Sequence, residues 1–122
     1  MDPNIAVAHQ DLGGAFASKG DLVGALAEER EALRLDPNND RAHVVLGMVL
    51  GTKGDLDGAI AEEREAVRLN PHDGLSHLSL GYVLERKGDY RNALEEYRIA
   101  YEMEPEDSNY RGNYERLLNK MR

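Results

Sequence analysis

Histidine recurs at one fixed interval in this sequence. His9, His43 and His77 are evenly spaced along the chain, and imidazole is a common ligand of transition metals. Equivalent residues on successive packed helices lie on axes about 8–10 Å apart, whereas zinc holds its ligand nitrogens at about 2.1 Å. We therefore predict no metal site and interpret these histidines as packing or hydrogen-bonding side chains. His72 falls in a predicted turn and is expected to be exposed.

Two acidic runs are the other candidates for chemistry. The sequence Glu-Glu-Arg-Glu occupies residues 28–31 and again 62–65, and neighbouring carboxylates can serve as general acid and base. The runs repeat at the same interval as the histidines, however, and Arg34 and Arg68 each follow three residues after the last glutamate. That spacing is typical of ion pairs on an exposed helix face. We therefore predict a solvated surface here and no acid–base role.

Other catalytic motifs are missing from the sequence. It contains no cysteine, which excludes disulfides and thiolate chemistry. It has no phosphate-binding loop, nucleophile elbow or dinucleotide fingerprint, and no Glu-x-x-His pair for a carboxylate-bridged metal centre. The sequence therefore predicts a protein that is not an enzyme and binds no cofactor.

The charge balance narrows the choice of partners. With 23 acidic and 15 basic residues the net charge is -8, which disfavours both nucleic acid and anionic membrane surfaces. No apolar run approaches the roughly 18 residues of a membrane span, and the start does not resemble a signal peptide. We expect a cytoplasmic protein with a solvated acidic surface. An alternative is that this surface selects a basic partner.

The whole chain is organised by an internal repeat with a period of about 34 residues. Lys-Gly-Asp-Leu at 19–22 recurs at 53–56, and Lys-Gly-Asp-Tyr follows at 87–90. Between residues 19–37 and 53–71, 15 of 19 positions are identical. Repeats of this length indicate stacked units that bury their apolar faces against neighbours.

Each unit is expected to contain two helices. Apolar residues in 55–69 recur at helical spacing; Asp55 stands where an N-cap belongs and Gly54 where the preceding helix ends. Pro71 follows the second helix, which it cannot continue, and Asp73 is the next candidate cap. The pattern predicts helices at about 4–18, 21–35, 39–52, 55–69, 73–86, 89–103 and 107–121.

Glycine also recurs inside the first helix of each unit, at Gly13, Gly47 and Gly81. Because a helical glycine costs about 1 kcal/mol relative to alanine, something must offset the cost. We expect close approach of the paired helix at these glycines. Alanines of the second helix fit the opposite side of the contact: Ala25, Ala59 and Ala93.

These residues resemble the tetratricopeptide repeat family. The second unit carries the pattern as Leu46-Gly47, Leu50, Ala59, Ala66 and Pro71. The first and third units match in phase, through Leu12-Gly13, Phe16, Ala25, Ala32 and Pro37, and through Leu80-Gly81, Leu84, Ala93, Tyr97, Ala100 and Pro105.

The resemblance implies an all-α fold, a right-handed α-solenoid of antiparallel helix pairs with seven helices. Residues 1–122 would form a single domain, with repeats at about 6–39, 40–73 and 74–107. A C-terminal capping helix would occupy 108–122, with an apolar stripe of Tyr110, Tyr114, Leu117, Leu118 and Met121.

The chain departs from the family pattern at two positions. His9, His43 and His77 stand where the family usually has tryptophan, while Glu29 and Glu63 stand where it has an aromatic residue, to which only Tyr97 conforms. We expect slightly looser packing at these places without a change of fold. Tyr90, Tyr97, Tyr101, Tyr110 and Tyr114 are expected to pack the last unit against its cap, or alternatively to form a tyrosine-rich binding edge.

The resemblance also assigns a concave groove lined by the first helix of each unit. Lys and Asn in this groove clamp a C-terminal carboxylate in some members, but the corresponding residues here are Gln10, Gly14, Val45, Leu75 and Ser79. We therefore expect no binding of chaperone C-terminal tails. Gly14 and Thr52 lie at groove positions, and the residues assigned to partner binding are Val7, Gln10, Arg41, Val44, Met48, Leu75, Leu78, Tyr82, Glu85 and Arg86.

The groove's composition predicts its occupant. Valine, leucine, methionine and tyrosine suit a partner peptide or helix with apolar anchors, unless some of them pack between the repeats. The leading hypothesis is therefore a protein-interaction scaffold. The alternatives are self-assembly into a homo-oligomer, through the groove or through a poorly covered N-terminal end at Ile5, Val7 and Ala8, and a non-catalytic arm of a larger protein.

Overall fold

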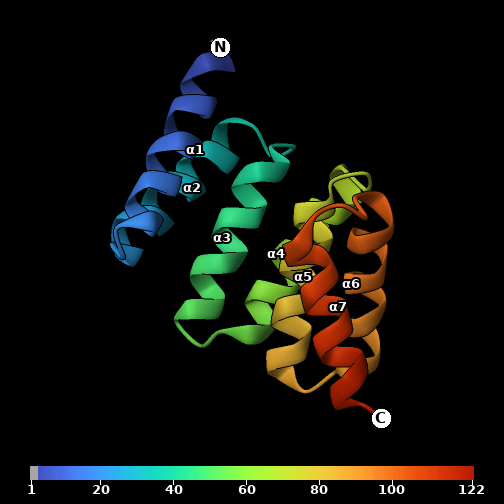
Figure 1. The fold of residues 1–122 in the computed structure, drawn as a ribbon. Coiled ribbons are helices and arrows are strands. Elements are labelled where there is room, and N and C mark those ends of the chain that lie inside the picture. Colours follow the sequence, from blue (N-terminus) through green and yellow to red (C-terminus); the bar gives the residue numbers. More distant parts are fainter. Residues whose placement is uncertain (1–2) are drawn as a thin grey trace.

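The computed structural model describes residues 3–122, and this part of the chain consists of seven α-helices joined by short turns. Figure 1 shows them laid down in chain order, with the first and last helices at opposite ends of the molecule. The helices are α1 (Pro3–Ser18), α2 (Leu22–Leu35), α3 (Asp40–Thr52), α4 (Leu56–Leu69), α5 (Gly74–Lys87), α6 (Tyr90–Met103) and α7 (Ser108–Lys120).

These bounds confirm the predicted all-α solenoid of seven helices. Contacts are most extensive within the pairs α1–α2, α3–α4 and α5–α6, and α7 packs on α6. The first helices of the pairs also touch one another, α1 with α3 and α3 with α5. None of the helices within residues 3–122 has the length and apolar character needed to cross a membrane.

Capping residues set the register of every unit. Asp21 and Asp55 accept hydrogen bonds from Gly24 N and Gly58 N, each at 2.9 Å. Such side chains satisfy amides that have no partner within the helix. Gly20, Gly54 and Gly88 have φ of 81°, 93° and 92°, in the left-handed region that glycine adopts without a Cβ penalty. The predicted punctuation is confirmed.

The core follows the repeats along the molecule. One buried cluster joins Ala25, Leu26, Leu46 and Val49. A larger one extends from Ala59 through Leu80 and Tyr97 to Leu117 on α7, which is fully buried. Leu50 packs against both clusters, so each unit buries its apolar residues against the next.

The cap helix α7 matches its predicted stripe in part. Tyr110 and Leu117 are buried, Tyr114 and Leu118 are partly buried, and Met121 is exposed. The rings of Tyr101 and Tyr114 lie 5.6 Å apart, and Tyr97 is fully buried. These contacts support the interpretation of the tyrosines as packing residues.

The recurring glycines do mark close approach of the paired helices. A Cβ on Gly47 would lie 2.8 Å from Cδ of Glu63, and one on Gly81 would lie 2.7 Å from the Tyr97 ring. The atoms nearest to Gly13 and Gly47 belong to Glu29 and Glu63 instead of the predicted alanines. Packing at these places is therefore tight, which corrects the expectation of looser packing.

Glu29 and Glu63 also correct the prediction of a solvated acidic face. Both side chains are fully buried, and none of their four carboxylate oxygens has a hydrogen-bond partner in the part of the chain that the structure describes. Burial raises the pKa of Glu63 to about 9, and the nearby charge of Glu62 adds to this effect. Burial likewise raises the pKa of Glu29 to about 8, with smaller contributions from Asp11 and Glu28. At neutral pH both carboxyl groups are therefore protonated in the fold.

The other glutamates of the runs have partners. Glu31 and Glu65 form the predicted surface ion pairs with Arg34 and Arg68, and hydrogen bonds from the guanidinium groups lower both carboxyl pKa values. The remaining two pair with histidines: Nδ1 of His9 lies 2.5 Å from Glu28 Oε2, and Nδ1 of His43 lies 2.6 Å from Glu62 Oε2.

The third unit repeats this histidine contact in its most buried form. Nδ1 of His77 lies 2.6 Å from Glu96 Oε2, and its Nε2 lies 2.8 Å from the carbonyl oxygen of Pro71. Both acceptors favour the protonated ring, and the hydrogen bond to Glu96 is the main reason why the pKa of His77 is raised. The histidines thus link the two helices of each unit, as the hydrogen-bonding interpretation predicted.

Candidate partner-binding groove

The groove is built from the first helix of each unit together with α7. The N-cap of each helix fixes which of its residues face the groove. The side chain of Asn39 accepts a hydrogen bond from Ala42 N and that of Asp73 accepts one from Leu75 N. Asp107 accepts one from Asn109 N, at 2.9 Å. Residues at the same place in successive units therefore face the same side of the solenoid.

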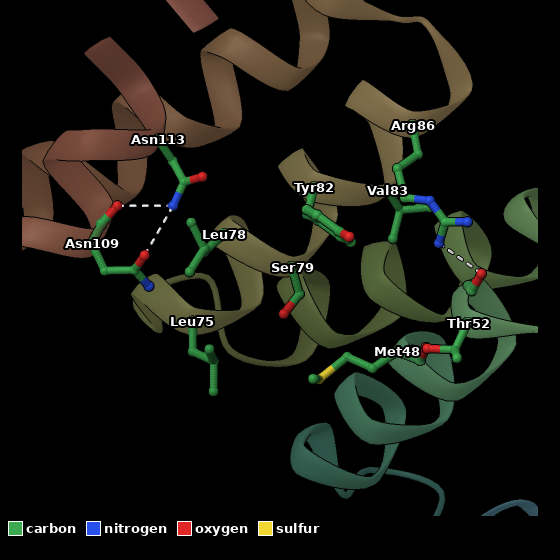
Figure 2. A pocket seen from close by; sticks show the side chains of 11 residues that line it. Met48, Thr52, Leu75, Leu78, Ser79, Tyr82, Val83, Arg86, Asn109 and Asn113 are labelled. Atoms are coloured by element: carbon green, nitrogen blue, oxygen red, sulfur yellow. Dashed lines mark hydrogen bonds between the residues drawn. The ribbon is translucent and has the colours of Figure 1, made fainter. Parts of the chain in front are cut away.

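One hollow lies between α3, α5 and α7 and encloses about 420 Å³. Figure 2 shows side chains of α5 reaching into it, with Met48 opposite them on α3, Asn109 and Asn113 at one end and Arg86 at the other. Met48 and Tyr82 are 52% and 57% exposed, so large apolar side chains are available to a ligand. The lining residues are Met48, Gly51, Thr52, Leu75, Leu78, Ser79, Tyr82, Val83, Arg86, Asn109 and Asn113.

A second hollow of about 540 Å³ continues along α1 and α3. It shares Met48, Thr52 and Leu75 with the first, so the two form one groove along the stacked helices. Its own lining residues include Gln10, Asp11, Gly14, Arg41, Val44 and Val45.

Most of the polar groups in the first hollow are already held in place. Asn113 Nδ2 donates to the backbone oxygen of Asn109 at 2.9 Å and to its side-chain oxygen at 3.1 Å. The Thr52 hydroxyl donates to Met48 O at 2.9 Å. Arg86 Nη1 donates to Gly51 O at 2.7 Å and thereby bridges α5 and α3.

The structure brings together eight of the ten residues that the sequence assigned to partner binding. These eight line one or both hollows: Gln10, Arg41, Val44, Met48, Leu75, Leu78, Tyr82 and Arg86. Val44 is only 2% exposed, so it forms part of the floor of the second hollow. Val7 is exposed but lines neither hollow.

Glu85 also lies outside the two hollows. Its carboxylate accepts hydrogen bonds from Arg116 Nη1 at 2.7 Å and from the Tyr97 hydroxyl at 2.8 Å. The bond from Arg116 is the largest cause of its lowered pKa. Glu85 thus links α7 to the third unit through its contacts with Arg116 and Tyr97.

Sequence reasoning missed the contribution of α7, which was assigned only as a cap. Asn109 and Asn113 lie one full repeat after Leu75 and Ser79, so continuing the repeat into the last helix would have found them. Within residues 3–122, no three His, Asp or Glu side chains are arranged to hold a metal ion.

Comparison with known proteins agrees with this architecture. The family model described as "Tetratricopeptide repeat" matches residues 1–40, 30–74 and 44–108. No curated protein matches the sequence significantly.

Solved structures of the same shape come from different organisms. The first TPR domain of human RPAP3 has a TM-score of 0.92 at 16% identity, covering 98% of this chain and 94% of that one. The first TPR of Spaghetti (RPAP3), bound to the HSP90 peptide SRMEEVD, has a TM-score of 0.91 at 16% identity, covering 99% and 96%. The Arabidopsis OM64 TPR domain has 0.85 at 18%, covering 92% and 93%.

Proposed function

This chain belongs to the tetratricopeptide repeat family, and we propose that it is a protein-interaction scaffold that holds a partner peptide or helix in its concave groove. The observation that carries the proposal is the exposure of Met48 and Tyr82 across one hollow from each other. Large apolar side chains left open in a concave site are typical of binding surfaces.

The size and lining of the groove support an apolar segment as the occupant. Leu75 and Leu78 lie between Met48 and the amides of α7, so anchors spaced along a helix or strand can meet successive apolar positions. The methionine adapts its shape to different anchors. A TPR structure of the same shape binds a short peptide of HSP90, which supports peptide binding in general.

Selection from a peptide library displayed on phage tests the proposal. Immobilised wild-type protein is expected to enrich peptides with apolar anchors, and Met48→Glu and Tyr82→Ala are each expected to weaken the best synthetic peptide by about tenfold or more. The matched control is Val23→Glu, because Val23 is 76% exposed and lines neither hollow. Equal affinities for Met48→Glu and wild type would reject the groove as the binding site.

A second candidate function is self-association through the N-terminal end. Leu12 is 45% exposed, whereas its equivalents Leu46 and Leu80 are buried in clusters that include residues of the preceding unit. Ile5, seven residues earlier on the same face of α1, is 47% exposed. Light scattering during size exclusion distinguishes the cases: a mass that rises with concentration and returns to 13.6 kDa in Leu12→Glu supports self-association, and a constant monomer mass rejects it.

A further inference from the structure

The first hollow carries a charge opposite to that of the protein as a whole. The chain has a net charge of -8, yet none of the acidic residues within 3–122 is among those that line this hollow. Arg86 is the single charged residue of the lining. In the second hollow Arg41 and Asp11 offset one another. Discrimination by charge therefore depends on the end of the groove where Arg86 lies.

Arg86 is held in place without being neutralised. Its Nη1 donates to Gly51 O at 2.7 Å, which uses one of the five N–H donors of a guanidinium. Within residues 3–122, no carboxylate forms an ion pair with it. Arg34, Arg68, Arg98 and Arg116 each pair with a glutamate instead.

The apolar side chains beside Arg86 set the position of the partner's charge. Met48 and Tyr82 flank the guanidinium end of the hollow, so a segment that fills the apolar part leaves its adjacent residue next to Arg86. A ligand that excludes water there leaves the cation partly desolvated, which favours a carboxylate and disfavours a lysine or arginine. The planar fork of a guanidinium also matches the two oxygens of a carboxylate.

We propose that the segment held in the groove carries a carboxylate that pairs with Arg86, next to the apolar anchors that contact Met48 and Tyr82. This inference rests on the proposed binding function and specifies its partner as an apolar segment with an acidic residue at one fixed position. It differs from the alternative that the acidic surface selects a basic partner, because the groove itself is cationic at this end.

Phage selections with three proteins in parallel test the pairing. Wild type is expected to enrich Asp or Glu at one position beside the apolar anchors, and Arg86→Glu is expected to enrich Lys or Arg at that position. Arg64→Glu is the matched control, since Arg64 is exposed and lines neither hollow. It changes the net charge by the same amount and is expected to select the same peptides as wild type.

A thermodynamic cycle then measures the contact with synthetic peptides. Replacing the selected Glu by Gln is expected to weaken binding to wild type by about tenfold and binding to Arg86→Gln by less than about twofold. Arg86→Lys, which retains the charge, is expected to recover part of the affinity. Circular dichroism and melting of each variant show whether the fold is retained after the contact with Gly51 O is lost.

The outcomes separate this inference from the function on which it rests. Peptides that bind in a manner sensitive to Met48→Glu, with no acidic preference and no change in Arg86→Glu, would overturn the pairing and leave the groove function intact. Enrichment of basic residues by wild type would also overturn it. Failure of wild type to enrich any peptide that depends on Met48 would overturn both.

Discussion

Replacing the buried Glu63 by glutamine is expected to stabilise the protein at neutral pH. The carboxyl pKa is about 9 in the fold against an ordinary value of 4.5, because the group is buried against Gly47 and has no hydrogen-bond partner. The folded chain therefore retains a proton that the unfolded chain releases. Glutamine has nearly the same shape and no ionisable proton, so it removes this dependence of stability on pH.

The magnitude follows from the distance between the two pKa values. Between pH 4.5 and about 9 the free energy of unfolding of wild type falls by about 1.4 kcal/mol per pH unit on account of Glu63. At pH 7 the cost is about 3 kcal/mol. Below pH 4.5 the side chain is neutral in both states and the cost vanishes. The contribution of Glu63 therefore lowers the stability of the wild-type protein as pH rises.

Urea denaturation of wild type and Glu63→Gln at several pH values between 4.5 and 9 measures the effect. Taking the difference between the two proteins cancels the titration of every other group. We expect a difference that grows by about 1.4 kcal/mol per pH unit in favour of the variant as pH rises above 4.5. Glu29→Gln should behave in the same way up to pH about 8.

Glu65→Gln is the matched control. The pKa of Glu65 is lowered by its hydrogen bond to Arg68 on the exposed face, so this variant should be slightly less stable than wild type, with no growing gain above pH 5. A pH-independent difference between wild type and Glu63→Gln would contradict the raised pKa, because it would mean that the Glu63 carboxyl ionises normally in the fold.

Three further predictions test the packing. Gly81→Ala should lower stability by about 1–3 kcal/mol, since the new Cβ would lie 2.7 Å from the buried Tyr97 ring. Gly112→Ala, in open space on α7, should instead raise stability by up to about 1 kcal/mol. Thermal unfolding compares the two variants, and equal effects would contradict the close approach of the helices at Gly81. Tyr97→Phe should cost about 1 kcal/mol in chemical denaturation through loss of the bond to Glu85, and an unchanged midpoint would show that this bond adds nothing. Because the pKa of His77 is raised in the fold, protonated His77 contributes to the free energy of unfolding below pH 6.5, and this contribution is lost as pH rises through the folded pKa. The stability advantage of wild type over His77→Gln should therefore shrink over that range. An advantage that grows with pH would mean that the pKa is lowered in the fold.

The repeat period made most of the fold predictable. Because Asp55, Gly54 and Pro71 mark helix ends by local backbone chemistry, the helices could be placed within one or two residues of the bounds found. The eight groove residues that line the two hollows were assigned from the resemblance to the tetratricopeptide repeat family and not from the period alone. Asn109 and Asn113 were missed because the last helix was assigned only as a cap, without continuing the 34-residue period into it.

Helical spacing alone did not reveal the environment of the glutamates. Glu28, Glu29 and Glu31 are neighbours in one run, yet they respectively contact a histidine, lie fully buried, and pair with an arginine on the surface. The environments of the three side chains differ because each faces a different side of α2, and the orientation of α2 depends on its contact with α1. The constant separation between histidine and glutamate, the same in all three units, was the available signal for the first of these contacts.

Backbone amide shifts in NMR spectra, recorded as the best selected peptide is added, show directly where the peptide binds. If the peptide binds in the groove, the largest shifts fall on residues 41–52 and 75–86 and on Asn109 and Asn113 of α7, and the amides of α2, α4 and α6 change little. Shifts concentrated on α2, α4 or α6 would contradict it, because the partner would then bind outside the groove.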